Sequence, residues 1–237
     1  MFPDLIRRGA KTALSVHGLL IKSCIFSIGW LMLPFWAFFI LSLYFYLVPF
    51  FQSFKLLIPF ILTLLAAAIL PNGFWFAVLL GTLFFLLFGI KNLILVNRFD
   101  NHQFMVFLIL FLMFFGFFWH FGNWQEWAVS LISFWIGLSF FFLFDELADY
   151  SRVSSESKKI IVSALGSFLI WQGAIVILFL PLNYFYQTAL LFLSSVILTD
   201  ILLGYLGGII GRRKMLADFS IFFVITVAIL ASANWGL

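Results

Sequence analysis

The stretch that decides the fold is 104–121, FMVFLILFLMFFGFFWHF, which contains no Asp, Glu, Lys or Arg. An α-helix rises about 1.5 Å per residue, so a run of this length crosses most of a hydrocarbon core about 30 Å thick. Similar uncharged runs recur on both sides of it along the chain. The stretch therefore predicts one membrane-spanning helix among several.

The composition of the whole chain supports the same class. Hydrophobic residues make up 65% of the 237 residues and charged residues only 9%, whereas a soluble domain carries roughly 25% charged residues. A water-soluble protein of this size could not cover so much apolar side chain. The apolar segments are continuous rather than alternating, which favours helices over a barrel. We predict an all-α, polytopic transmembrane helical bundle.

The apolar runs predict about eight spans. Pro34 and Pro59 fall inside the first two and predict kinks, and Pro71-Asn72-Gly73 predicts a tight turn. Because the second span is short, 54–96 is either a pair of crossing helices or a re-entrant pair. The predicted spans are 24–48, 54–70, 74–96, 104–121, 127–147, 158–180, 186–210 and 216–234.

Residues 1–23 differ from the rest of the chain. Asp4, Arg8, Lys11 and Lys22 recur at spacings that place them on one helical face, with apolar residues largely opposite. This pattern predicts a basic amphipathic helix in the membrane interface, and the alternative is the solvated start of the first span. The remaining 24–237 would form a single transmembrane domain.

A weak internal repeat is also visible. Pro71-Asn72-Gly73 followed by aromatic residues resembles Pro181-Leu182-Asn183 followed by aromatic residues. The same offset would relate 24–121 to 127–234 as two four-helix halves, a plan that some transporters use. Aromatic residues are common at membrane interfaces in any case, so chance similarity is the alternative.

Orientation is ambiguous in the eight-span arrangement. Eight Lys and Arg residues, from Lys91 onward, fall on one side, and five, from Arg7 to Lys55, fall on the other. The positive-inside rule would then place both termini outside. A basic amphipathic helix would rather lie on an anionic cytoplasmic leaflet. One miscounted span between residues 18 and 90 would remove the conflict.

Asp200 is the main candidate functional residue, because it lies alone in the apolar run 184–210. An ionisable group inside a membrane is costly and usually faces a partner or a cavity. Lys91 is the first expected partner, with His120 and Gln172 as others. The alternative is a static bond between helices.

A second polar cluster, Asp145-Glu146-Leu147-Ala148-Asp149, precedes Arg152 at the end of a span. Asp145 and Asp149 share a helical face, and Arg152, Lys158 or Lys159 could pair with them. Two such carboxylates could also bind a divalent cation for chemistry on a lipid-linked substrate, although no second motif accompanies them. A solvated charged loop is the alternative.

Small residues mark one further segment. Gly204, Gly207, Gly208 and Gly211 form two overlapping Gly-x-x-x-Gly patterns, which allow close approach of another helix. The contact could be internal, or it could join this chain to a second copy or another membrane protein.

No catalytic, metal or cofactor motif is present, and the single cysteine, Cys24, excludes an intrachain disulfide. The leading hypothesis is a small transporter that uses a buried carboxylate. The alternatives are a non-catalytic scaffold or complex subunit, and an intramembrane enzyme. We expect a multi-pass protein of the plasma (inner) membrane without a cleaved signal peptide, surrounded by lipid and binding no nucleic acid.

Overall fold

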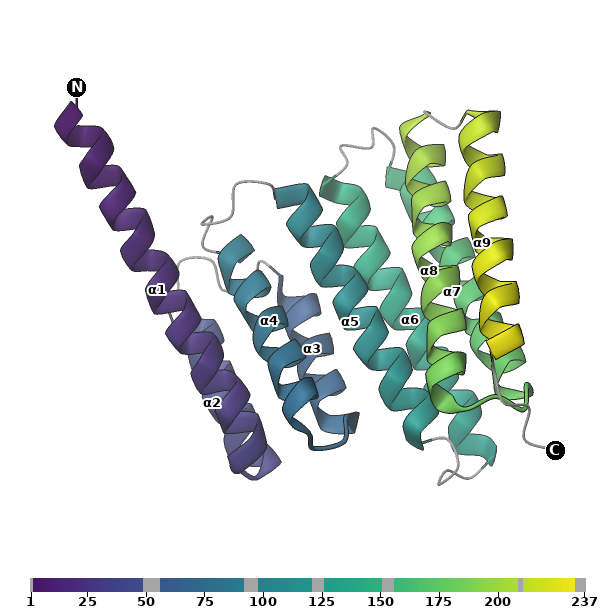
Figure 1. The fold of residues 1–237 in the computed structure, drawn as a ribbon, viewed down its shortest axis with the longest axis horizontal. Helices are drawn as coiled ribbons and strands as arrows, with labels where there is room; N and C mark the ends of the chain where they lie inside the picture. The colour runs from purple at the N-terminus through teal and green to yellow at the C-terminus, as the bar shows by residue number, and fades with distance from the viewer. Residues whose placement is uncertain are drawn as a thin grey trace. The chain divides into compact units, whose positions relative to one another are not determined.

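The structure is a computed structural model, and it describes residues 2–48, 56–91, 98–120, 126–150, 156–208 and 211–232. Side chains are described within these ranges except for 2–15, 98, 126–128, 150 and 212–214. The described residues form nine α-helices and no strand (Figure 1). The predicted all-α fold is therefore confirmed. The helices are α1 Phe2–Met32, α2 Phe35–Leu47, α3 Leu57–Ile69, α4 Phe74–Lys91, α5 Arg98–His120, α6 Glu126–Tyr150, α7 Glu156–Leu178, α8 Tyr184–Gly207 and α9 Arg212–Ser232.

Six helices, α4 to α9, each contain a segment long and apolar enough to cross a membrane. The protein is thus a polytopic membrane protein with a helical bundle, as predicted. The last six predicted spans agree with these helices to within a few residues. The remaining apolar helical segments, Val16–Met32, α2 and α3, are shorter, so the difference from the predicted eight spans lies before residue 74.

The single span predicted at 24–48 is wrong. Helix α1 runs without a break from Phe2 to Met32, and the chain then turns back at Leu33 and Pro34. Pro34 has the extended ψ of 146° that precedes α2, because proline cannot continue the helix before it. Residue 23, the predicted end of an interfacial helix, lies inside α1. In its predicted basic face, the side chains of Asp4, Arg8 and Lys11 lie outside those described, and Lys22 is half-buried.

Pro59 does not kink a span. It lies in the first turn of α3, where its missing N–H is not needed for a helical hydrogen bond. Helices α2 and α3 have 13 residues each, which corresponds to about 20 Å and is less than a hydrocarbon core of about 30 Å. Neither helix can cross alone.

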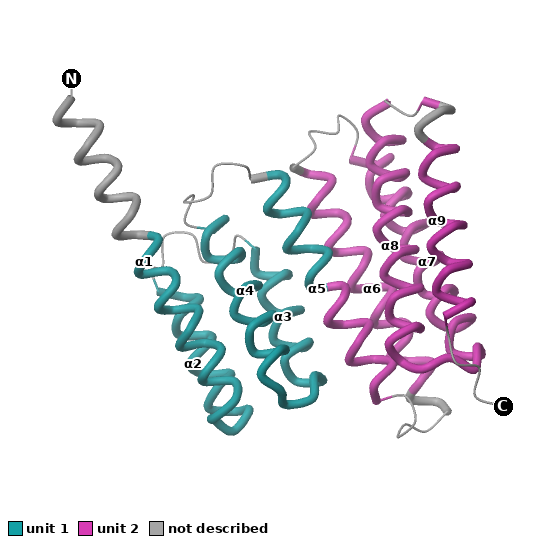
Figure 2. Tube along the Cα trace, viewed as in Figure 1, with its two compact units in different colours: residues 1–109 teal, residues 110–237 magenta. Residues whose placement is uncertain are grey.

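The contacts divide the chain into two compact units, Met1–Ile109 and Leu110–Leu237, and the boundary falls within α5 (Figure 2). In the first unit, α1 packs against α2 and α4, and α3 packs against α4. Phe26 of α1 lies at the centre, with its ring 4.0 Å from that of Phe84 and 4.8 Å from that of Phe38. In the second unit, α6, α7, α8 and α9 pack in sequence.

Long polar side chains satisfy the ends of several helices. The last carbonyls of an α-helix lack an intrahelical donor, and an unsatisfied carbonyl in hydrocarbon costs several kcal/mol. Here a side chain from a neighbouring segment donates to such carbonyls. The pairs are Lys91 to Tyr46, Trp30 to Ala67 and Tyr186 to Ser232. Gln187 adds a second donor to the carbonyls of Ile177 and Leu180, which also accept from backbone N–H groups in the turn after α7.

The turns at 71–73 and 181–183 are both non-helical and are followed directly by helices, at Phe74 and Tyr184. This similarity is local, so the four-plus-four repeat stays a prediction.

Candidate functional site

Lys91 is the most deeply buried charged residue among the described side chains, with 2% of its surface exposed. It is the last residue of α4. Its ammonium donates a hydrogen bond to the carbonyl of Tyr46, lies 3.8 Å from the centre of the Tyr46 ring and lies 5.7 Å from that of Phe88. Lys91 therefore lies in a pocket of aromatic side chains at the end of α2.

Two short helices, α2 and α3, supply the residues that surround the Lys91 ammonium. Tyr46 is the penultimate residue of α2, and Phe60 is in the first turn of α3. Their rings stack at 4.1 Å, which holds the end of α2 beside the start of α3. A helix C-terminus carries a partial negative charge, and aromatic faces attract cations. Both features favour an ammonium at this position.

These neutral partners do not replace a counter-ion. Among the residues that the structure describes, no carboxylate forms an ion pair with Lys91. A buried charge without an opposite charge is costly in a membrane protein and is a functional hypothesis by default. The surroundings of Lys91 thus consist of aromatic side chains and a helix-end carbonyl, and an anion would be the missing opposite charge.

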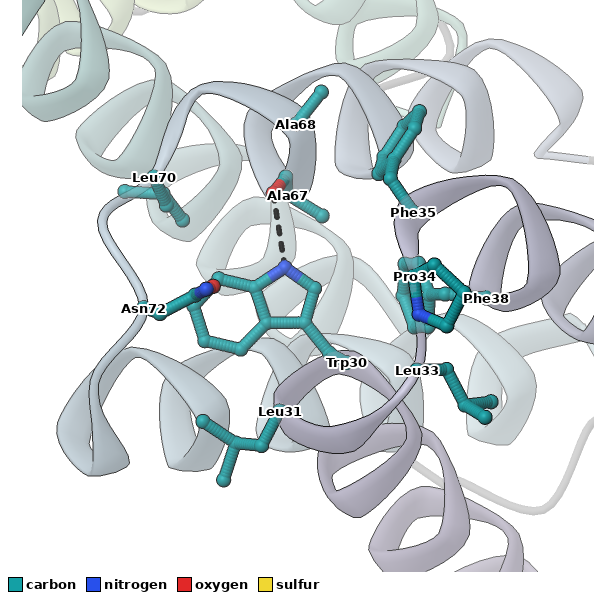
Figure 3. Close-up of a pocket in the computed structure, with 10 residues that line it drawn as sticks. All are labelled: Trp30, Leu31, Leu33, Pro34, Phe35, Phe38, Ala67, Ala68, Leu70 and Asn72. Carbon is teal, nitrogen blue, oxygen red and sulfur yellow. Dashed lines mark hydrogen bonds between the residues drawn. The ribbon is translucent and has the colours of Figure 1, made fainter.

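A cavity of about 370 Å³ lies at the opposite end of α2 and α3 (Figure 3). It is enclosed by the turn between α1 and α2 and by the turn between α3 and α4. The Trp30 indole lies inside it and donates to the Ala67 carbonyl at 2.9 Å. Asn72 is the other lining residue with a polar side chain. The lining residues are Trp30, Leu31, Leu33, Pro34, Phe35, Phe38, Ala67, Ala68, Leu70 and Asn72.

The acidic cluster at the end of α6 is held by one lysine. Lys159 of α7 lies 3.2 Å from Asp145 and also contacts Asp149. Lys159 is one of the three cations expected to pair with these acids. Lys158 instead lies 4.4 Å from the Tyr205 ring centre, and Arg152 lies outside the described residues. The ammonium occupies the space between two carboxylates where a divalent cation would bind.

The other polar candidates are dispersed. Asp200 is half-buried on α8, His120 is half-buried at the end of α5, and Gln172 is exposed on α7. The pairing of Asp200 with Lys91 stays a prediction, because the two residues belong to different units.

The glycine segment does not form a close contact at its end. Gly208 is the left-handed cap of α8, with φ of 68°, and no atom lies within 4 Å of a Cβ built on Gly208 or Gly211. Gly204 is half-buried and Gly207 is exposed. An interface with another molecule through this segment stays a prediction.

The close helix contacts lie at other glycines. A Cβ on Gly137 would lie 2.9 Å from Trp171 Cβ, and one on Gly81 would lie 2.0 Å from Ser27 Oγ. Gly166 is similarly close to Leu202 and Phe140. A small-x-x-x-small spacing marks two of these positions, Ser133 with Gly137 and Ala77 with Gly81, and could have identified them. Gly166 has no small residue four positions away.

Comparison with protein-family models, curated proteins and solved structures finds no match for this chain.

Proposed function

We propose that this chain is a small transporter of the plasma membrane that carries an amphiphilic anion, with Lys91 as the group that binds the negative charge. The observation that carries the proposal is a buried lysine that has aromatic neighbours and a helix end, but no carboxylate partner among the described residues. An anion that enters the aromatic pocket would supply the missing counter-ion.

The cavity around Trp30 supports an amphiphilic substrate. It is lined mainly by apolar side chains, as is usual for sites that bind apolar parts of a ligand. Phe35 and Ala67 line it at one end of α2 and α3, whereas Tyr46 and Phe60 lie beside Lys91 at the other end. A cavity lined by apolar side chains and a buried cation thus lie along the same pair of helices.

The described membrane-spanning helices carry few polar side chains, and this argues against a strongly hydrated substrate. A path for a sugar or an amino acid needs polar groups at several depths to replace water. The proposal shifts the charged group from Asp200 to Lys91, because Asp200 is only half-buried while Lys91 is almost completely buried.

The test is uptake of radiolabelled octanesulfonate, a permanently charged amphiphilic anion, by liposomes that contain the purified protein. Wild-type protein should accelerate uptake over empty liposomes. Lys91→Gln should lower the initial rate at least about tenfold, since removal of a charge partner costs about 1.4 kcal/mol or more. Lys91→Arg keeps the charge and should retain much of the rate.

Lys158→Gln is the matched control, because it removes an exposed lysine that also lies over an aromatic ring. Its uptake rate should equal that of wild type. Uptake no faster than in empty liposomes would contradict transport of this class of substrate. A wild-type rate in folded Lys91→Gln would contradict the role of Lys91.

A non-catalytic subunit of a membrane complex is the second candidate. The supporting observation is α9, in which no described residue is buried, together with the exposed glycines at the end of α8. The intramembrane enzyme is a weaker proposal, because Lys159 already occupies the space between Asp145 and Asp149.

A further inference from the structure

The positions of Lys and Arg along the helices divide each unit into a basic end and an end without them. In the second unit, α6 and α7 run antiparallel, since Lys159 contacts Asp145 at one end and Trp171 contacts Ser133 further along. Helices α7 and α8 run antiparallel as well, because Lys158 lies over Tyr205 while Gln187 reaches Ile177.

The basic end of this unit therefore contains the start of α7, the end of α8 and the start of α9. Lys158 and Lys159 begin α7, and Arg212, Arg213 and Lys214 begin α9. The opposite end contains the turn 179–183, where α7 meets α8, and the last turn of α9, where Tyr186 donates to Ser232. That end has no Lys or Arg.

The first unit has the same asymmetry. Phe26 of α1 contacts Phe84 of α4, while Trp30 and Asn72 line one cavity, so α1 and α4 run antiparallel. The start of α1, with Arg7, Arg8, Lys11 and Lys22, thus points toward the Lys91 end of α4. The turns at 33–34 and 70–73, at the cavity end, contain no Lys or Arg.

Helices α2 and α3 do not change this division. Helix α2 starts at the cavity end, where Phe35 lies, and α3 ends there, where Ala67 lies. The end of α2 and the start of α3 meet at the other end, where Tyr46 stacks on Phe60. At about 20 Å each they are too short to cross. They thus have the geometry of a re-entrant hairpin, which is tolerated in a membrane when protein buries it.

We propose that α1 and α4 to α9 cross the membrane seven times around a re-entrant α2–α3 hairpin, with the basic end of each unit, its basic face, against the anionic headgroups of the cytoplasmic leaflet. Apart from Lys55 and Arg152, which lie outside the described residues, every Lys and Arg belongs to the half of its unit at this face. The positive-inside rule then has no conflict. The inference does not depend on the proposed transport activity.

Among the lysines of the first unit, Lys22 and Lys91 lie farthest from the basic face, and their side chains lean in opposite directions. Side chains on a helix tilt toward its N-terminus. Lys22 therefore leans toward the basic face, where a long side chain can reach headgroups. Lys91 leans back into the unit, toward Tyr46, and so remains with its aromatic partners.

The test is labelling of single cysteines with a membrane-impermeant maleimide in a Cys24→Ala background, in which the chain has no other thiol. Trp36→Cys, Asn72→Cys and Asn183→Cys should react in intact bacterial cells. Thr12→Cys and Ser157→Cys should react only after the cells are permeabilised. Trp36 lies at the start of α2 and Asn72 lies in the turn between α3 and α4, so they test two segments near the same cavity. Both residues are exposed.

Two outcomes would overturn the topology. The first is labelling of Thr12→Cys in intact cells, which would place the start of α1 with the turns. The second is a Trp36→Cys variant that stays unlabelled even after permeabilisation while Asn72→Cys reacts, since a single span over 24–48 would bury residue 36 in lipid.

A second experiment tests whether the basic face contacts anionic headgroups. Thermal unfolding of the full chain should occur at a higher temperature in phosphatidylglycerol vesicles than in phosphatidylcholine vesicles, and the difference should shrink in 0.5 M salt because salt screens surface charge. Equal unfolding temperatures in the two lipids would overturn this part of the proposal.

Discussion

The Lys91 ammonium lies 3.8 Å from the centre of the Tyr46 ring and also donates to the Tyr46 carbonyl. One residue thus supplies both an aromatic face and a helix-end carbonyl to a buried cation. The same Tyr46 ring stacks on Phe60, which connects the cation to both short helices.

Tyr46→Ala should destabilise the first unit by about 3–5 kcal/mol, the usual cost of deleting a large buried aromatic side chain. The expected result is a lower midpoint of unfolding in mixed detergent micelles. Tyr44→Ala is the matched control, because Tyr44 lies on the same helix with 61% of its surface exposed. Similar midpoints for the two variants would contradict the packing described for Tyr46.

Gly137→Ala should destabilise the contact between α6 and α7 by about 1–3 kcal/mol, the range for overpacking. The new Cβ would lie 3.0 Å from the Ser167 carbonyl oxygen and 2.9 Å from Trp171 Cβ, and neither atom is the end of a flexible side chain. The measurement is again the unfolding midpoint in micelles.

Gly173→Ala is its control, since a Cβ there meets only Leu191 Cδ1 at 3.5 Å. Alanine is the better helix former by up to about 1 kcal/mol, so this variant should be neutral or slightly more stable. A Gly137→Ala variant as stable as Gly173→Ala would show that the helices do not approach this closely.

Asp145→Asn should destabilise the protein more than Asp149→Asn. Both carboxylates contact Lys159, but the Asp145 side chain is 30% exposed and the Asp149 side chain is 62% exposed. Exposed ion pairs contribute at most about 1 kcal/mol. Unfolding of both single variants and of each in a Lys159→Gln background measures the two couplings. A larger coupling for Asp149 would show that the shorter Lys159–Asp149 contact outweighs its greater exposure, and would contradict the prediction.

Gln187→Leu should destabilise the turn between α7 and α8 by about 1 kcal/mol, because the carbonyls of Ile177 and Leu180 lose their side-chain donor and keep only the backbone N–H groups of Leu180 and Leu182. Gln172→Leu removes the same group from an exposed position of α7 and should leave stability unchanged. Amide hydrogen exchange near residue 180 should rise only in Gln187→Leu; equal exchange in both would rule out this cap.

The sequence alone was sufficient to predict α4 to α9 as membrane-spanning helices, because uncharged runs alternate there with short turns rich in charge or tryptophan. It was insufficient before residue 74. Pro34 is compatible with a kink or with a complete turn, and only the packing of Phe38 against Phe26 decides for the turn. The 13-residue length of α3 likewise depends on where its first turn begins, at Leu57.

The candidate site was predictable only in part. Lys91 could be selected as an ionisable residue next to an apolar run, and Lys159 could be named as a partner of the Asp145 cluster. The contact between Lys91 and Tyr46 joins residues far apart in the chain, and no local pattern records it. The glycine prediction chose the longest Gly-x-x-x-Gly run, although Gly137 and Gly81 make the close contacts.

The most direct measurement of the central claim is octanesulfonate uptake by Lys91→Gln and Asp200→Asn proteins, reconstituted side by side at equal amounts. The account predicts at least a tenfold loss for Lys91→Gln, as the charge partner of the anion is removed, and a rate within about twofold of wild type for Asp200→Asn. A wild-type rate in folded Lys91→Gln, with loss of uptake in Asp200→Asn, would contradict the account and assign the function to the carboxylate on α8.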